Sequence, residues 1–183
     1  RVGTMLAEAS AEAGLDDFGD EVFHESLTRL VDALNSELVL SEKGKAAVKG
    51  DIHRILVNRL RFAEDVKRHP EILDEDGSDP IVILGMPRTG TTKLQRLMSA
   101  DPDVQSLEYW RLVNVAPFPG AVPGQEDPRI AAAQQAIDAT KKLMPTWMKS
   151  HSQSVHDADE EAYLLIYTLK TTMAYMVRPI PGY

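Results

Sequence analysis

A short apolar run that leads straight into a glycine-containing turn constrains the fold of this chain more than any other feature. Residues 81–84 read I-V-I-L, a continuous and mostly β-branched run that is typical of a strand buried on both faces of a parallel sheet. Residues 85–92 follow as G-M-P-R-T-G-T-T, and helical spacing of apolar residues then continues to Ser99. The order strand, loop, helix therefore predicts an α/β fold in which helices flank a parallel sheet.

The first 75 residues instead have the pattern of a helical subdomain. Between residues 22 and 38 apolar positions recur at steps of three and four, which places them on one stripe of a helix. The same spacing returns from residue 48 to about His69, and Ser41 is a suitable N-cap. We expect two parts: a helical N-terminal subdomain over residues 1–75 and an α/β domain over residues 76–183.

Two glycines suit the loop for binding an anion, because the first N–H groups of a helix lack partners within it and the helix dipole is positive there. Gly85 and Gly90 have the separation of the nucleotide-triphosphate loop G-x-x-x-x-G-K-[ST]. Thr91 replaces the lysine that would reach the outer phosphates, and the cation of the loop is Arg88 instead. A loop of this kind suits a single phosphate that carries a transferable group, and such a site needs no magnesium.

The string P-R-T-G-T-T at residues 87–92, after an apolar strand, resembles the 5′-phosphosulfate loop of sulfotransferases that use 3′-phosphoadenosine 5′-phosphosulfate (PAPS). It is similar to bacterial members whose loop begins G-x-P-R-[ST]-G-T-[ST]. The resemblance implies a P-loop, nucleotide-kinase-like sheet and metal-independent transfer of a sulfuryl group from PAPS to an acceptor hydroxyl. The products would be a sulfate ester and 3′-phosphoadenosine 5′-phosphate (PAP). It also implies the donor-binding residues Pro87, Arg88, Thr89, Gly90, Thr91 and Thr92.

Three residues are candidates for catalysis. Arg88 would stabilise charge on the leaving phosphate as an electrostatic clamp, because arginine stays protonated; its alternative role is a surface ion pair. Glu108 resembles the glutamate base of protein-tyrosine sulfotransferases in its distance from their R-S-G-T-T stretch, although it would also suit a structural ion pair. His156 is the rival base, because histidine side chains titrate near neutral pH. Its acidic neighbours would either orient it or simply begin a helix.

The acidic stretch after this histidine does not predict a metal site. Asp157, Asp159 and Glu161 alternate as in a calcium loop, but the glycine and final glutamate of that loop are missing. We expect helices over residues 130–143 and 157–175 and a second short strand over residues 104–107. Four large apolar side chains either line an acceptor pocket or belong to the core: Trp110, Met144, Trp147 and Met148.

Composition narrows the class of partner. The net charge of −8 is a poor match for nucleic acid, whose partners carry basic surfaces. The sequence has no cysteine, no secretory signal pattern and no apolar run long enough to span a bilayer. We therefore expect a cytoplasmic enzyme whose acceptor is a hydroxyl of a small molecule, lipid or glycan, and the oligomeric state stays open.

Two alternative functions remain open, and the 3′-phosphate site expected of the family is missing from the sequence. The loop would also suit a P-loop phosphotransferase or nucleotide-binding protein, although the missing lysine argues against it. A non-catalytic helical interaction protein, in which the loop is only a turn, is the other alternative. Family members are longer and carry an arginine and a serine for the 3′-phosphate, whereas Arg178 has no serine after it. The resemblance thus implies a partial domain whose 3′-phosphate site lies outside this chain.

Overall fold

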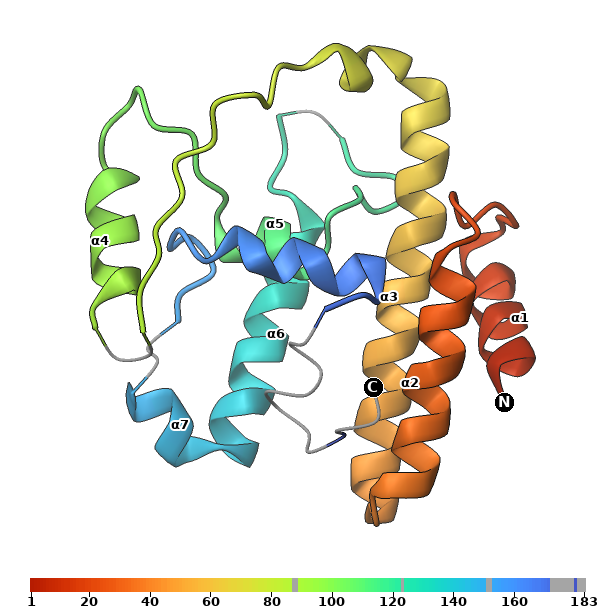
Figure 1. The fold of residues 1–183 in the computed structure, drawn as a ribbon. Helices are drawn as coiled ribbons and strands as arrows, with labels where there is room; N and C mark the ends of the chain where they lie inside the picture. Colours follow the sequence, from red (N-terminus) through yellow and green to blue (C-terminus); the bar gives the residue numbers. More distant parts are fainter. Residues whose placement is uncertain (87–88, 123, 151–152, 172–179, 181–183) are drawn as a thin grey trace. The chain divides into compact units, whose positions relative to one another are not determined.

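The computed structural model describes residues 1–86, 89–122, 124–150, 153–171 and 180. Two compact units make up the chain, one from Arg1–Asp74 with Leu164–Tyr183 and the other from Glu75–Tyr163 (Figure 1). Helices supply most of the regular structure that is described in each unit. None of the described helices combines the length and the apolar character that crossing a lipid bilayer requires.

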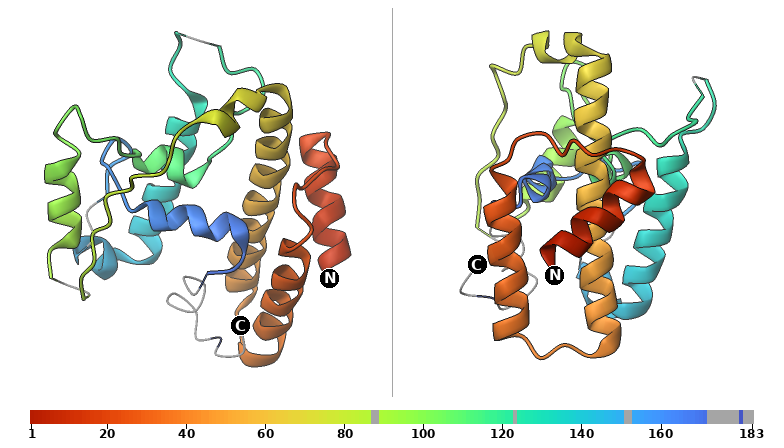
Figure 2. Two further views of the ribbon diagram at one scale, coloured as in Figure 1. Left: turned by 45° about the horizontal axis from the view of Figure 1, so that its top comes forward. Right: turned by 90° about the vertical axis from the view of Figure 1, so that its right-hand side faces the viewer.

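Three α-helices build most of the first unit: α1 (Val2–Ala13), α2 (Phe23–Glu37) and α3 (Glu42–Arg68), followed by the 3₁₀ helix η1 (Pro70–Asp74). Helices α2 and α3 are antiparallel and joined at one end, while α1 crosses obliquely and contacts both (Figure 2). The predicted N-terminal helices are confirmed, and the Ser41 hydroxyl caps α3 by accepting the Gly44 N–H at 3.2 Å. Apolar side chains of α2 and α3 are buried in the core: Phe23, Leu27, Leu30, Leu34, Ile52, Leu56 and Leu60.

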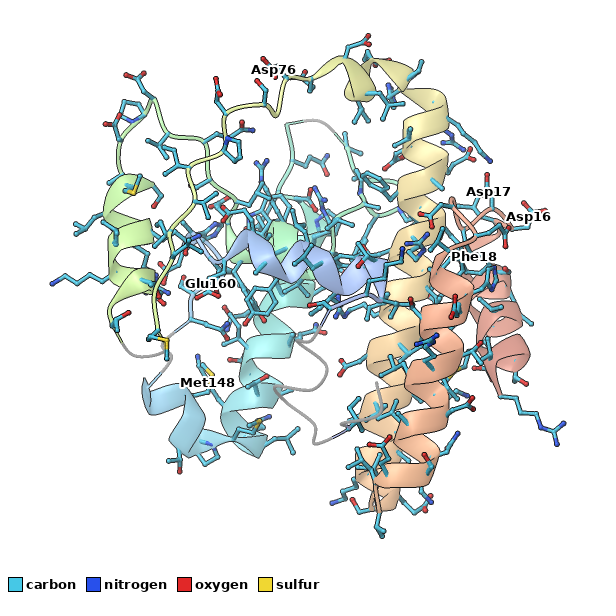
Figure 3. All side chains as sticks on the ribbon, in the orientation of Figure 1. Asp16, Asp17, Phe18, Asp76, Met148 and Glu160 are labelled. Atoms are coloured by element: carbon cyan, nitrogen blue, oxygen red, sulfur yellow. The ribbon has the colours of Figure 1, made fainter. Side chains whose placement is uncertain are left out.

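Helix α1 is attached to α3 by one buried small residue and by charged pairs around it. Ala9 is completely buried, and it is the one buried residue of α1. Glu8 lies 2.8 Å from the Lys49 ammonium, and Glu12 lies 2.6 Å from the His53 ring. The connection after α1 adds a pair of 2.6 Å between Asp17, which Figure 3 labels, and Lys67.

Two arginines of α3 bind Tyr167 within the first unit. The Arg59 guanidinium donates to the Tyr167 carbonyl at 2.8 Å and lies 4.2 Å from the centroid of the Phe23 ring. The Tyr167 hydroxyl accepts a hydrogen bond from Arg54 at 2.9 Å. Burial raises the pKa of this hydroxyl, which keeps it protonated as a structural group.

The α-helix predicted over residues 157–175 is wrong for the residues that the structure describes. Residues Glu161–Thr168 form the 3₁₀ helix η2, and Leu169 then adopts a left-handed backbone with φ 54°. Arg59 binds the carbonyl of Tyr167, near the end of η2, and the left-handed residue stops the helix there. Apolar spacing alone could not reveal these tertiary contacts.

The second unit contains α4 (Thr91–Met98), α5 (Tyr109–Val113), α6 (Pro128–Leu143) and α7 (Pro145–Ser150). The predicted helix after residue 130 is confirmed as α6, which begins with an Asp127 N-cap and a proline at its first position. The core of this unit is one cluster, and Met148 of α7, labelled in Figure 3, packs against it. Its buried members are Trp110, Ala133, Ile137 and Val155.

The predicted parallel sheet is wrong, because no sheet forms in the described part of the chain. Residues 81–84 have no strand partner there, and Ile81, Val82 and Leu84 are 62, 68 and 88% exposed. Residues 104–107 are not a strand either, and the β-type pairing among the described residues is a single antiparallel bridge between Glu108 and Ala158. A strand needs the N–H and C=O groups of a neighbour, which an apolar run cannot supply for itself.

Candidate active site

The described part of the loop bends back on itself before α4. The N–H and the hydroxyl of Thr89 both donate to the Met86 carbonyl, at 3.3 and 2.7 Å. A Cβ atom on Gly85 would lie 2.7 Å from Cγ2 of Thr91 and 2.8 Å from Oγ1 of Thr89. The bend therefore requires glycine at residue 85, since any side chain would displace the two threonines.

Helix α4 begins with geometry that suits an anion. Gly90 is its N-cap and adopts a left-handed backbone with φ 95°, which glycine does at low cost. The Leu94 N–H donates to the Gly90 carbonyl at 3.0 Å, so the N–H groups of Thr91 and Thr92 precede the first intrahelical bonds. These N–H groups and the positive end of the helix dipole together favour a phosphate.

Side chains of α4 tie the loop to the acidic segment near the end of the second unit. Gln95 donates through Nε2 to the Asp159 carbonyl at 2.8 Å and to Oε2 of Glu161 at 3.2 Å. Arg96 places a guanidinium nitrogen 3.2 Å from Oδ2 of Asp157. The helix that starts at the loop is thus fixed to the segment that follows His156.

Residues 107–110 pair with residues 155–159 in antiparallel orientation through backbone hydrogen bonds. Three N–H···O=C bonds form this pairing: Asp159 to Leu107 at 3.1 Å, Tyr109 to Asp157 at 2.9 Å and Trp110 to Val155 at 3.2 Å. The bridge between Glu108 and Ala158 lies within it. The pairing explains why Glu108 and His156, which are 48 positions apart, meet.

The two candidate bases contact each other directly. Oε1 of Glu108 lies 3.0 Å from Nδ1 of His156, and the two side chains are 37 and 58% exposed. An ionised carboxylate only accepts hydrogen bonds, so Nδ1 carries the hydrogen of the neutral ring and Nε2 keeps a lone pair. The pair can therefore accept a proton from a hydroxyl at Nε2, with the carboxylate stabilising the imidazolium that forms.

The second carboxylate oxygen of Glu108 has its own donor. The indole Nε1–H of Trp110 donates to Oε2 at 2.8 Å. Nε of Arg111 is 3.8 Å from the same oxygen, which is an ion pair too long for a hydrogen bond. Both oxygens of this carboxylate are thus engaged by other side chains.

The acidic residues after His156 make structural hydrogen bonds. Asp159 is buried, and its two oxygens accept from the Glu160 N–H at 2.8 Å and from Gln153 at 3.3 Å. Burial, with the Asp159 carboxylate nearby, raises the pKa of Tyr163, so that hydroxyl stays protonated and does not act as a base. Within the described ranges, no three His, Asp or Glu side chains are grouped to hold a metal ion.

Most of the predicted site residues can be located. The loop residues that are described are Thr89, Gly90, Thr91 and Thr92. Pro87 and Arg88 lie outside the described residues. Sequence reasoning missed the contributions of Gln95 and Arg96, which join α4 to the site, and that of Trp110. No sequence signal marks the contacts of Gln95 and Arg96, because they join residues that are far apart in the sequence.

Comparison with known proteins identifies the protein family of this chain. A family model described as the Sulfotransferase family matches residues 80–183, more than half of the 183 residues. The chain belongs to the sulfotransferase family. This confirms the resemblance carried by the loop, and the matched region includes the loop, Glu108 and His156. No curated protein sequence matches the chain significantly.

Two solved mycobacterial sulfotransferases resemble this member of the family. STF1 from Mycobacterium tuberculosis H37Rv is 28% identical with a TM-score of 0.81, over 100% of this chain and 50% of that one. STF9 from Mycobacterium avium is 26% identical with a TM-score of 0.72, over 95% of this chain and 47% of that one. The chain thus spans about half the length of these sulfotransferases.

Proposed function

We propose that the full-length protein transfers a sulfuryl group from PAPS to an acceptor hydroxyl. The observation that carries this proposal is the family match, which covers the loop and both candidate bases. In the reaction, the bond between sulfur and the bridging oxygen of the 5′-phosphosulfate breaks, and a bond forms between sulfur and the acceptor oxygen. PAP, a sulfate ester and one proton result.

The donor's 5′-phosphate would bind at the start of α4. The N–H groups of Thr91 and Thr92 and the positive end of the helix dipole suit its oxygens, and Arg88 supplies a permanent charge as phosphate character develops. Because the charge to be stabilised is that of one phosphate, we propose no metal. The acceptor is a hydroxyl of a small molecule, lipid or glycan, and we propose that the reaction takes place in the cytoplasm.

Glu108 and His156 would act as one unit rather than as rival bases. The 3.0 Å contact between Oε1 of Glu108 and Nδ1 of His156 supports different roles for the two residues, in which Nε2 of His156 takes the acceptor proton. Glu108 would hold the ring in the required tautomer and stabilise its charged form.

Transfer of ³⁵S from labelled PAPS to a panel of phenols, sterols and glycans, catalysed by the full-length protein, tests this proposal. His156→Ala should lower the transfer rate by about 100-fold or more, the usual contribution of a general base. His69→Ala is a matched control, because His69 also lies 3.0 Å from a glutamate oxygen and is similarly exposed, at 61%. Unchanged transfer in His156→Ala, or equal losses in the two variants, would refute the proposed base.

A P-loop phosphotransferase is the main competing function, and calorimetric titration separates it from a sulfotransferase. The full-length protein should bind PAP without magnesium and more tightly than it binds ADP. Binding of ADP that is tighter than that of PAP and depends on magnesium would support the phosphotransferase instead.

A further inference from the structure

We propose that Trp110 is a positioning residue for the reaction, because its indole N–H holds Oε2 of Glu108 and thereby presents Oε1 to His156. This inference rests on the proposed function and deepens it. The two distances that define the arrangement are 2.8 Å from Nε1 to Oε2 and 3.0 Å from Oε1 to Nδ1. The Glu108 carboxylate thus connects the buried indole N–H of Trp110 to the exposed ring of His156.

Trp110 is much more buried than Glu108, whose carboxylate accepts its indole hydrogen bond. Its side chain is 5% exposed and packs in the cluster with Ala133, Ile137 and Val155. Its own backbone N–H donates to the Val155 carbonyl at 3.2 Å. The indole N–H is therefore a fixed reference point next to a carboxylate that is 37% exposed.

Two guanidinium groups further restrict the indole. Those of Arg129 and Arg111 lie over the ring, 4.7 and 4.8 Å from its centroid. Arg129 is itself bound to the Asp127 carboxylate and to the carbonyls of Asn114 and Val115. The start of α6 thus restrains the ring that holds Glu108.

The identity of residue 108 supports a role other than helix capping. Glu108 is the N-cap of α5, a position at which serine, threonine, aspartate and asparagine are preferred. Its side chain makes no capping hydrogen bond. The carboxylate is instead shared between Trp110 and His156, as expected for a group whose orientation matters to the chemistry.

The hydrogen bond can be tested without any turnover, by NMR of the full-length protein labelled with ¹⁵N-tryptophan. Trp110→Phe identifies the indole signal of residue 110 by its disappearance. Glu108→Ala should move this signal and speed its exchange with solvent, whereas His69→Ala should leave it in place. A signal that does not respond to Glu108→Ala would overturn the inference.

The catalytic consequence is tested by comparing Trp110→Phe with Ile137→Val in the ³⁵S transfer assay. Phenylalanine keeps an aromatic ring in the cluster but has no N–H donor, while Ile137→Val loosens the same cluster without touching the hydrogen bond. We expect Trp110→Phe to lower kcat about 10-fold, since a hydrogen bond to a charged group is lost, with PAP affinity unchanged. Ile137→Val should keep kcat within about twofold, for a comparable change in Tm.

Each outcome of this comparison has one interpretation. Equal losses of kcat in the two variants would show a merely structural role for Trp110, and a wild-type kcat in Trp110→Phe would also overturn the inference. If the wild-type protein transfers no sulfuryl group to any acceptor, the proposed function fails and the positioning role fails with it. The NMR result then shows separately whether the Trp110–Glu108 contact exists.

Discussion

Gly85 lies so close to Thr91 that a Cβ atom on residue 85 would be 2.7 Å from Cγ2 of the threonine. Both side chains that it would meet belong to short threonines of the same bend, so relief requires the bend itself to move. Gly85→Ala should therefore weaken PAP binding about 10-fold or more, in line with the about 1–3 kcal/mol that overpacking costs. Calorimetric titration with PAP measures the loss. Gly77→Ala is the control, because a Cβ on Gly77 meets nothing within 4 Å; equal affinities of the two variants would contradict the prediction.

Ala9 should matter more for the attachment of α1 than the ion pairs beside it. The side chain is fully buried, so Ala9→Leu forces an overpacked contact that costs about 1–3 kcal/mol of the free energy of unfolding. Glu8→Gln removes a pair whose members are 41 and 53% exposed, and such exposed pairs contribute little to stability and are screened by salt. Urea unfolding of the two variants and of Ala7→Leu, an exposed position on α1, measures the difference. A larger loss in Glu8→Gln than in Ala9→Leu would contradict this order.

The Asp127–Arg129 pair should stabilise the second unit in a pH-dependent way. Hydrogen bonds from the Arg129 side chain lower the pKa of Asp127 below its usual value, although burial opposes this shift. Because the pKa is lower in the folded state, the stabilisation is present above the unfolded-state value of about 4 and disappears as pH falls through the folded-state value. Asp127→Ala should cost about 1–2 kcal/mol at pH 7, since the N-cap is lost as well.

Chemical unfolding between pH 7 and pH 2 measures this difference in free energy. The gap between wild type and Asp127→Ala should shrink as the pH falls. Asp138→Ala on the same helix is the control, because Asp138 is 54% exposed and lies 3.7 Å from Lys141. A gap that stays constant over the pH range would show that the carboxylate charge is not responsible.

The helical part of the fold could be predicted because its signals are local. Apolar spacing located α2, α3, α4 and α6, and Ser41 gave the start of α3 to the residue. The strand predicted at residues 81–84 is wrong, because local spacing does not decide strand formation in the same way. Its β-branched pattern is correct for a buried strand, but a strand also needs a hydrogen-bonding neighbour, which the described residues do not provide.

The candidate site shows the same division between local and long-range information. Glycine spacing and the threonines pointed to the loop, and charge chemistry pointed to Glu108 and His156 as separate bases. Their contact depends on three backbone hydrogen bonds between segments far apart in sequence, which no local pattern encodes. Trp110 binds Glu108 only two positions away, but its apolar ring suggested core or pocket and gave no indication of this hydrogen bond.

Gln95 should couple the donor loop to the proposed base pair, because it lies on α4 and donates to the Asp159 carbonyl at 2.8 Å. Asp159 belongs to the segment that pairs with residues 107–110 and so places His156 beside Glu108. If this link sets the position of the loop relative to the base, Gln95→Ala should lower kcat about 10-fold while PAP affinity changes less than about twofold, since a small misplacement slows transfer more than binding. Leu97→Ala is the matched control, as Leu97 is 64% exposed on the same helix and both replacements keep high helix propensity.

The ³⁵S transfer assay measures kcat and calorimetry measures the affinity for PAP. If Gln95→Ala lost as much PAP affinity as kcat, the glutamine would support the loop alone and would not couple it to the base.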